Sequence, residues 1–593
     1  MLKRSCLLTT ILLISLLSLP GTSRGAGLER SGRWFKYDGA YPYYVGYDLQ
    51  QLFAAKAYSY DDMDYKLNQL QEFRVNKIRI WTDPWFMGTD AYYPWAVNAN
   101  GKKNLDVWDN TYWARMRDFT QKCKDRGIVV EVSIFAPYPS DVGLWNDNFY
   151  KIAWNRTFNV NGAFSTNSSG HFWPQFFDLD LTERSTSGKT LRDYQKALID
   201  KTIDELKGFG NVYFEIANEF PGVWTDDGSG IGQVYRWQQY WADYMHATKG
   251  AITTAHSNEG STMNTWGIQY FRDRPSVDVL NFHFYADDPD NIDRISDFLH
   301  PLQTTGKILQ SNESFALEDP DYTDVTTREA WAAFTSGAYY FHYQDTPDII
   351  GTPSWRANAE RLKVLRNVAE SVSFWQMSAV DASGNEYDTL VTRGPGRHWQ
   401  VLANPGKDYV VFFSGVPGAT GVEMDLPSGD YAYRYFDTRA WNSDGIGSGS
   451  MTSHGGSISI SAPAAGSWNE ASGVVLVIRR ASPPYAVSSN IADGQTLSGS
   501  VRWTATPSGS PGTLKMEFYV DNVLKWTDNQ SPFSFNGDNE LLDTTVLVDG
   551  LHDLVVRAYS VGDETAESRA YVAISNAAAT AARPAMPTGL TVK

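Results

Sequence analysis

Cysteine is nearly absent from the 593-residue sequence, which contains only two. Cys6 lies inside an N-terminal apolar run, so removal of that run leaves Cys123 alone and excludes an internal disulfide. The nine histidines include no His-x-x-x-His pair, so the sequence gives no case for a bound zinc ion. Stability is therefore expected to come from buried apolar cores.

Positive charge is also scarce. Lys and Arg total 51 against 68 Asp and Glu, which gives a net charge of −17 at pH 7. This balance argues against nucleic acid or an anionic membrane surface as a partner, because both would repel the chain. Aromatic residues are abundant at 14%, including 21 Trp and 33 Tyr. Flat rings at this density indicate large cores or clefts lined with aromatic side chains.

An apolar run at the N-terminus is typical of a targeting signal. Lys3 and Arg4 precede an apolar stretch over 6–19, and Pro20 and small residues follow it. A secretory signal peptide has this layout, whereas the run is short for a membrane anchor. We expect residues 1–26 to be cleaved and the mature protein to be secreted, extracellular or periplasmic, without insertion into a membrane.

The region 27–385 alternates short apolar stretches with helical ones. The strand candidates are 77–81, 128–135, 211–217, 278–285 and 307–312. Helical stretches lie between them, such as 191–209, which has apolar residues at helical spacing. This alternation over this length predicts an α/β fold, a (β/α)8 TIM barrel. An open doubly wound sheet is the alternative, although no Gly-rich phosphate turn follows an early strand.

The rest of the chain is predicted to form two all-β sandwich domains. After residue 385, short strands alternate with Gly, Pro and Asp turns, and helical periodicity disappears. We expect a β-sandwich over 386–481 and a second sandwich over 482–577, separated by a stiff Pro-Pro linker. Residues 578–593 are expected to be a linker or the start of a truncated module.

Polar side chains stand at the expected carboxyl ends of the barrel strands, where barrel enzymes place their chemistry. These candidates are Asn218, Glu219, His283, Tyr285 and Glu313. Three βα units could separate Glu219 from Glu313, which would put the two carboxyls across the barrel mouth. Glycosidic cleavage needs such a pair, one to donate a proton and the other to attack the anomeric carbon or activate water. The alternative for Glu219 is a helix start, which acidic residues favour.

Further residues could support this pair. The Asn218 amide would bind a sugar hydroxyl beside the reacting carbon, and the Tyr285 phenol could orient the nucleophile. Arg79 would keep Glu313 ionised, unless it is an ordinary buried ion-pair member. His283 is either a substrate contact or a buried, hydrogen-bonded histidine. The rings of Trp81, Trp173 and Trp224 are candidates to stack on sugars, and the alternative for each one is packing in the core or a loop.

The segments "FEIANE" and "NFHFYADDP", followed by a glutamate after the seventh strand, resemble clan A glycoside hydrolases. The pattern is most similar to the cellulase-like family 5. This resemblance implies an acid/base at Glu219 and a nucleophile at Glu313. It also implies no cofactor and a supporting set of Arg79, Asn218, His283 and Tyr285.

Two departures from that family indicate a divergent branch. The third strand ends in Phe135 and Ala136, where family 5 enzymes often have a histidine. The usual tryptophan near the eighth strand is replaced by Tyr340, His342 and Tyr343, and His342 is taken as a candidate substrate contact. The family's substrate is therefore not carried over to this chain.

The C-terminal domains carry resemblances of their own. "LANPGKDYVVFF" and "LPSGDYAYRYFDTRAW" resemble the small sandwich of apiosidase-like proteins. "SVRWTA" and "MEFYVDN" resemble bacterial immunoglobulin-like modules of secreted carbohydrate-active enzymes.

Together these features predict a secreted, retaining glycoside hydrolase that cleaves a β-linked oligo- or polysaccharide by double displacement. The alternative enzyme is an apiosidase-like or other exo-glycosidase acting on an unusual sugar. The alternative from another class is a non-catalytic carbohydrate-binding protein. The sequence leaves the sugar, the linkage, endo or exo action and the oligomeric state open.

Overall fold

The computed structural model describes most of the chain and divides into two compact units, Met1–Arg479 and Arg480–Lys593. The described residues are 27–49, 52–135, 153–154, 156–162, 176–218, 232–256, 266–284, 291–314, 323–342, 347–382, 389–415, 420–464, 466–481, 485–509, 512–537, 541–560 and 565–576. The expected signal segment 1–26 and the terminal segment 578–593 lie outside them.

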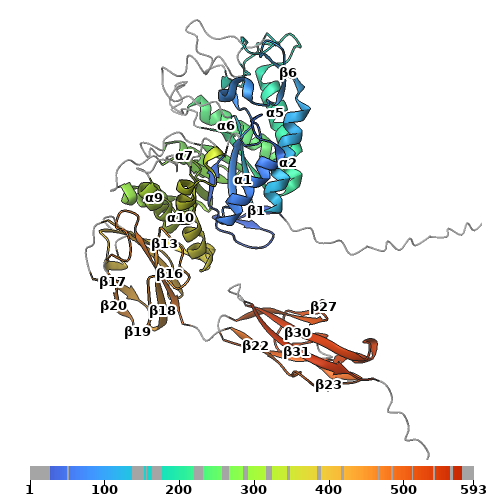
Figure 1. The fold of residues 1–593 in the computed structure, drawn as a ribbon, viewed down its shortest axis with the longest axis vertical. Helices are drawn as coiled ribbons and strands as arrows, with labels where there is room; N and C mark the ends of the chain where they lie inside the picture. Colours follow the sequence, from blue (N-terminus) through green and yellow to red (C-terminus); the bar gives the residue numbers. More distant parts are fainter. Residues whose placement is uncertain are drawn as a thin grey trace, which may run out of the picture. The chain divides into compact units, whose positions relative to one another are not determined.

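An eight-stranded parallel sheet forms the centre of the first unit (Figure 1). In spatial order its strands are β3 (Gly46–Asp48), β4 (Lys77–Trp81), β7 (Val129–Phe135), β8 (Val212–Ala217), β9 (Thr253–His256), β10 (Val279–Phe282), β11 (Ile308–Ser311) and β12 (Tyr339–Tyr340). Spatial order follows chain order, and a parallel bridge between Tyr47 and His342 joins the first strand to the last. This confirms the predicted barrel, because a doubly wound sheet would reverse its strand order.

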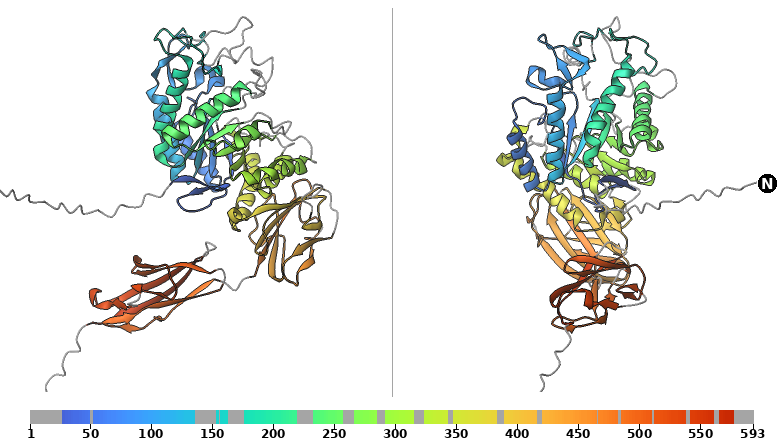
Figure 2. Two further views of the ribbon diagram at one scale, coloured as in Figure 1. Left: turned by 180° about the vertical axis from the view of Figure 1, so that it is seen from behind. Right: turned by 90° about the vertical axis from the view of Figure 1, so that its right-hand side faces the viewer.

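Helices alternate with the strands and cover the outside of the barrel (Figures 1 and 2). They are α1 (Tyr60–Glu72), α2 (Asn110–Asp125), α5 (Leu191–Leu206), α6 (Gln233–Tyr244), α7 (Trp266–Arg272), α8 (Asn291–Leu299), α9 (Thr323–Thr335) and α10 (Pro353–Glu370). Ser59 and Thr190 begin α1 and α5 with capping boxes that satisfy free backbone N–H groups. Within the described ranges, none of the helices has the length and apolar character needed to cross a bilayer.

Shorter elements connect these strands and helices. The short 3-10 helices are η1 (Trp85–Asp90), η3 (Lys207–Phe209), η6 (His300–Thr305), η7 (Pro347–Ile349) and η8 (Phe374–Gln376), and η5 (Met245–Lys249) is a short π-helix. Two hairpins pair β1 (Leu28–Ser31) with β2 (Trp34–Tyr37) and β5 (Trp95–Val97) with β6 (Lys103–Trp108). Phe35 of β2 packs on Tyr213 and Tyr339, whose ring centroids lie 4.9 and 5.7 Å away, and so fills the amino-terminal end of the barrel.

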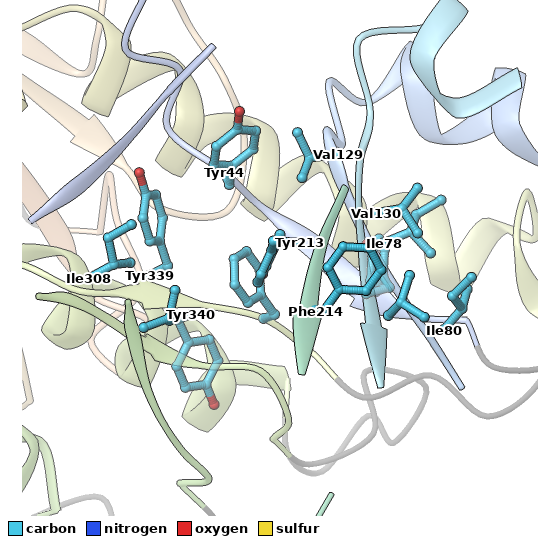
Figure 3. Close-up of a cluster of buried hydrophobic side chains, with 14 of the residues drawn as sticks. Tyr44, Ile78, Ile80, Val129, Val130, Tyr213, Phe214, Ile308, Tyr339 and Tyr340 are labelled. Atoms are coloured by element: carbon cyan, nitrogen blue, oxygen red, sulfur yellow. The ribbon is translucent and has the colours of Figure 1, made fainter. Parts of the chain in front are cut away.

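Side chains on the barrel strands alternate between the interior and the helical layer, as the period of two requires. Figure 3 shows Phe214 beside Ile78, Ile80 and Val130, while Tyr213 points to the other side of β8. Ile78 and Ile80 of β4 therefore face the helices, and Lys77, Arg79 and Trp81 face inward. This alternation decides which side chains can meet inside the barrel.

A β-sandwich completes the first unit. One sheet has the order β13 (Ser378–Ala382), β15 (His398–Asn404), β16 (Asp408–Ser414), β21 (Val474–Arg480), β18 (Gly429–Asp437) and β19 (Gly447–Ser453). The other has the order β14 (Val391–Arg393), β17 (Gly421–Leu426) and β20 (Gly456–Ser461). Because β13 pairs with β15, the sandwich sheet begins before the boundary expected at residue 385.

Helices of the barrel pack against the sandwich. The Trp331 ring of α9 stacks on Phe412 of β16, with centroids 6.0 Å apart and planes 16° from parallel. Arg328 donates a hydrogen bond to the Ala471 carbonyl at 2.8 Å, and His398 Nδ1 lies 2.8 Å from Asp293 Oδ2. An apolar stack and two polar contacts thus join the sandwich to the barrel.

The second unit is all β. Its main sheet has the order β23 (Thr496–Leu497), β31 (Thr565–Ile574), β30 (Gly550–Ser560), β26 (Thr513–Val520) and β27 (Val523–Asp528). Smaller sheets contain β22 (Ala486–Ser489), β25 (Thr504–Ser508) and β28 (Phe533–Ser534), and β24 (Ser500–Arg502) with β29 (Leu541–Asp543), before η10 (Thr544–Val546). Asp521 and Asn522 take φ values of 51° and 63° between β26 and β27, as a tight hairpin turn requires.

We expect Trp331→Ala to lower the free energy of unfolding of the first unit by about 3–5 kcal/mol, because a buried ring is lost and a cavity remains. Trp331 is 1% exposed. Urea titration followed by circular dichroism measures the change. Trp526→Ala is the control, because this 36%-exposed residue belongs to the second unit. Equal first-unit midpoints for both variants would contradict the packing described.

Candidate active site

Arg79 lies at the centre of a polar network inside the barrel and is completely buried. Its Nη1 donates to Asp48 Oδ2 at 2.7 Å and to Glu313 Oε2 at 3.0 Å. Its Nε and Nη2 donate to Glu215 Oε2 at 2.9 and 2.7 Å. Burial alone would lower the pKa of Arg79, but the carboxylates of Glu215, Asp48 and Glu313 raise it well above its usual value. The guanidinium is therefore a permanent cation shared by three carboxylates.

Sheet register explains why these groups meet. Asp48 on β3 and Glu131 on β7 are the register partners of Arg79 on β4, and partners in a parallel sheet face the same side. Glu215 occupies the inward position of β8, beside Ser133. Glu215 therefore points into the barrel interior, toward Arg79.

A second ion pair lies one inward position nearer the amino-terminal end. Lys77 Nζ is 2.6 Å from Glu131 Oε2, and both side chains are fully buried. The ammonium also lies 3.8 Å from the centroid of the Phe341 ring. Burial lowers the pKa of Lys77, while Lys77 and Arg79 together outweigh burial and lower the pKa of Glu131. This pair fixes Glu131, which in turn holds Asn312.

Amide side chains connect the carboxylates into one layer. Asn312 Nδ2 donates to Glu131 Oε1 and Glu215 Oε1, both at 3.0 Å. Asn281 Nδ2 donates to Glu215 Oε1 at 3.1 Å and to Asn312 Oδ1 at 2.8 Å. Asp48, Asn281 and Asn312 were not predicted from the sequence. The signal that could have found them is the inward position of each on its strand.

Asn218 follows β8 and is completely buried. Its Oδ1 accepts a hydrogen bond from Arg79 Nη2 at 2.6 Å. This contact fixes the orientation of the amide, and Nδ2 has no hydrogen-bond partner in the described part of the chain. Because a buried donor without a partner is costly, Asn218 is poised to donate to a ligand oxygen.

His283 and Glu313 lie side by side at the ends of β10 and β11. Asn312 Nδ2 donates to Glu131 and Glu215, so Oδ1 is the amide oxygen, which can only accept, and His283 Nε2, 2.8 Å away, carries the proton that it donates to this oxygen. The other ring nitrogen, Nδ1, lies 3.8 Å from Glu313 Oε2. Glu313 is 6% exposed. The structure thus brings Arg79, Asn218, His283 and Glu313, four of the candidate site residues, together.

Trp81 also reaches this region. It occupies the inward position after Arg79 on β4, and the guanidinium carbon lies 5.7 Å from the indole centroid. Its side chain is nearly buried. The other predicted site residues, Glu219, Tyr285, Trp173 and Trp224, lie outside the described residues.

The structure does not bring His342 to the site. Tyr339 and Phe341 face inward, so Tyr340 and His342 face the helices, and Figure 3 shows the rings of Tyr339 and Tyr340 on opposite sides of their strand. The His342 ring lines a small cavity between α9 and α10, next to Trp331 and Leu362. Its expected role as a substrate contact is corrected on this ground, because strand alternation directs it away from the barrel interior.

The arrangement as a whole is a water-poor layer of carboxylates and amides at the carboxyl ends of barrel strands. Two of its members, Glu313 and Asn218, are held by one arginine. Within the described part of the chain, no three His, Cys, Asp or Glu side chains are arranged to hold a metal ion.

Comparison with known proteins gives a likeness of fold. No protein-family model and no curated protein matches the chain. A solved structure described as a glycoside hydrolase matches with a TM-score of 0.51 and 13% identity, over 77% of this chain and 97% of that one. A glycoside hydrolase family 5 protein from Bacteroides vulgatus ATCC 8482 matches with a TM-score of 0.49 and 14% identity, over 77% and 93%. An endo-1,4-beta-mannanase from Rhizomucor miehei matches with a TM-score of 0.41 and 13% identity, over 54% and 90%. The first of these shows that the chain shares its fold with a glycoside hydrolase.

We expect Arg79→Leu to lower the free energy of unfolding by about 3–5 kcal/mol, because Asp48, Glu215 and Glu313 would lose their common counter-charge while remaining buried. Urea titration at pH 7 measures the loss. Arg393→Leu is the matched control, because Arg393 pairs with Glu423 on the surface of the sandwich and such pairs contribute about 1 kcal/mol or less. Similar small losses in the two variants would contradict the network.

Acid should destabilise the first unit through His342. Burial lowers the pKa of His342 to about 3, whereas a histidine in an unfolded chain titrates near about 6.5. Between these values the unfolded chain binds a proton that the folded chain does not. We therefore expect this group to remove about 1.4 kcal/mol of stability for each pH unit below about 6.5. Urea titrations at pH 5, 6 and 7 should show a shallower loss for His342→Gln than for the wild type, and equal slopes would refute the assignment.

Proposed function

We propose that the protein is a retaining glycoside hydrolase that cleaves β-linked oligo- or polysaccharides. The observation that carries the proposal is the contact of one buried arginine with both the Glu313 carboxylate and the Asn218 amide. These groups sit at the carboxyl ends of barrel strands, where enzymes with this fold carry out their chemistry. The fold shared with a glycoside hydrolase supports the same conclusion.

Glu313 is the nucleophile in this proposal. Arg79 Nη1, 3.0 Å from Oε2, stabilises the carboxylate anion, which is the form that attacks carbon. His283 Nδ1, at 3.8 Å from the same oxygen, borders the carboxylate on a second side. Arg79 thus holds the carboxylate in place during attack, with the His283 ring beside it.

Glu219 is the acid/base. In the sequence it directly follows Asn218, the residue after β8, whose amide is held by Arg79. Strand β8 is separated from β11 by β9 and β10 in the sheet. In the proposed mechanism, the carboxyls of Glu219 and Glu313 lie on either side of the glycosidic bond, as double displacement requires.

The reaction proceeds in two steps. A Glu313 carboxylate oxygen bonds to the anomeric carbon as the bond to the leaving oxygen breaks, and that oxygen takes the proton of Glu219. Water then gives a proton to Glu219 and bonds to the anomeric carbon, and the ester bond to Glu313 breaks. Asn218 Nδ2 donates a hydrogen bond to the sugar hydroxyl next to that carbon. The configuration at the anomeric carbon is retained, and the steps need no cofactor.

We further infer that the protein is secreted and belongs to a divergent branch of clan A. Lys3, Arg4 and the apolar stretch 6–19 support the signal peptide. The motifs "FEIANE" and "NFHFYADDP" support the clan. The apiosidase-like sandwich and the immunoglobulin-like module remain resemblances of sequence, and we assign both domains to the carbohydrate-active enzymes on that basis.

The test is product release from β-glucan, mannan, xylan and 4-nitrophenyl β-glycosides. We expect Glu313→Ala to lose turnover by about a thousandfold or more, with azide restoring part of it and giving the glycosyl azide of inverted configuration. Glu219→Ala should lose about 10²–10⁴-fold on polysaccharide and less on substrates whose leaving group needs no protonation.

Glu423→Ala is the control, because this exposed glutamate lies on the sandwich. Proton NMR of the first product should show the β-anomer, and the α-anomer would overturn the retaining mechanism. Equal turnover by all four proteins would show that these carboxyls are not catalytic. Binding of oligosaccharides without any turnover by the wild type would identify a carbohydrate-binding protein instead.

A further inference from the structure

His256 is the last residue of β9, the fifth strand of the barrel, and its side chain faces the interior. Its register partner on β10 is Asn281, whose amide lies in the Glu215 and Asn312 layer, so the two residues share the inner face. The His256 ring lies 4.2 Å from the ring of His283, measured between centroids. His283 in turn borders Glu313, so one ring separates His256 from that carboxylate.

The imidazole of His256 is buried and has neither nitrogen engaged. It is 1% exposed, and among the residues that the structure describes neither Nδ1 nor Nε2 has a hydrogen-bond partner. Leaving one buried polar atom without a partner costs about 1–3 kcal/mol. An apolar side chain at this position would avoid that loss of free energy. We therefore expect a ligand to make hydrogen bonds with the His256 ring nitrogens.

The main chain of His256 is held by a dedicated contact. Gln238, buried on α6, donates from Nε2 to the His256 carbonyl at 2.9 Å and accepts from the His256 N–H at 3.0 Å. A single amide thus satisfies both backbone groups at the end of the strand. This fixes the direction of the side chain at the point where β9 ends, while leaving both ring nitrogens unused.

The chemistry of the ring selects the kind of ligand. Burial, with smaller effects of His283 and Arg79, lowers the pKa of His256 well below its usual value, so the ring is neutral. A neutral imidazole offers one N–H donor and one acceptor nitrogen. Sugar hydroxyls match both, since each hydroxyl can donate and accept. A carboxylated ligand would leave the acceptor nitrogen facing another acceptor.

We propose that His256 is a substrate-binding residue whose imidazole binds hydroxyl groups of a neutral sugar ring held beside Glu313. The inference rests on the proposed function and extends it to a residue on the fifth strand. His256 takes no proton from the reacting atoms. It contributes by completing the hydrogen bonds of a bound sugar in a site that excludes water.

The experiment compares wild type with His256→Leu and His256→Gln. We expect His256→Leu to reduce kcat/KM by about tenfold or more on whichever of the substrates named above the wild type cleaves fastest. The reason is that the sugar hydroxyls would lose their hydrogen bonds to the imidazole. Its melting temperature should equal or exceed that of the wild type, because an unpartnered buried group is removed. His256→Gln, which restores a donor and an acceptor, should recover part of the lost kcat/KM.

Tyr47→Phe is the matched control. The Tyr47 phenol is also buried and, within the described ranges, without a hydrogen-bond partner, but its ring faces Trp355 of α10 on the outside of the barrel. Its removal should leave kcat/KM unchanged and the melting temperature equal or higher. Loss of activity confined to the His256 variants therefore reports on the site.

Three results would overturn the assignment. A kcat/KM within twofold of wild type for His256→Leu would show that the imidazole contacts no substrate. Equal losses for His256→Leu and His256→Gln would show that shape alone matters at this position. Absence of turnover and of oligosaccharide binding in the wild type itself would defeat the proposed function, and the assignment with it. That last result differs from the first two, which require an active wild type.

Discussion

The salt bridges of Arg79 are the interaction on which the rest of the barrel interior depends. A buried guanidinium must be surrounded by acceptors, and here they come from β3, β8 and the residues after β8 and β11. Glu215 is held in turn by the amides of Asn281 and Asn312, so the network includes side chains from most of the strands. A second buried cation, Lys77, holds the layer beneath by pairing with Glu131. The site is thus built on strands, which are more rigid than loops.

Among the described residues, the buried polar side chains of the barrel include two groups, those that contact only other protein groups and those with unused hydrogen-bonding atoms. Asp48, Glu215 and Asn312 direct all their observed contacts toward other protein groups. In the part of the chain that the structure describes, Asn218 Nδ2 and both ring nitrogens of His256 have no hydrogen-bond partner, although both residues are buried. Glu313 contacts Arg79 and is slightly exposed. Buried nitrogens without partners close to this carboxylate are the positions where we expect a ligand.

Much of this could be predicted from the sequence, and the failures have physical causes. The apolar runs of β4, β7, β8, β10 and β11 are recognisable as strands. Polar residues at the ends of β8, β10 and β11 identify Asn218, His283 and Glu313, and the inward direction of β4 identifies Arg79. Strands β3 and β12 have only three and two residues, and β9 is as long as β10 and β11 but, as Thr-Thr-Ala-His, has no apolar run. Asp48 and His256 were missed for that reason. His342 was assigned to the wrong face because side-chain direction depends on register, which composition does not reveal.

The way in which the barrel closes determines where the sheet is expected to open locally. Among the residues that the structure describes, one bridge, Tyr47–His342, joins β3 to the segment of β12, through hydrogen bonds of 2.9 and 3.0 Å, whereas β4 and β7 share five register pairs. This seam is the least reinforced junction of the sheet, so local opening and amide hydrogen exchange should begin there. Asp48 sits on the seam and is also a ligand of Arg79. Separation of β3 from β12 would therefore also disturb the salt bridge between Asp48 and Arg79. Because Arg79 also binds Glu313, the position of that carboxylate depends on the closure of the barrel.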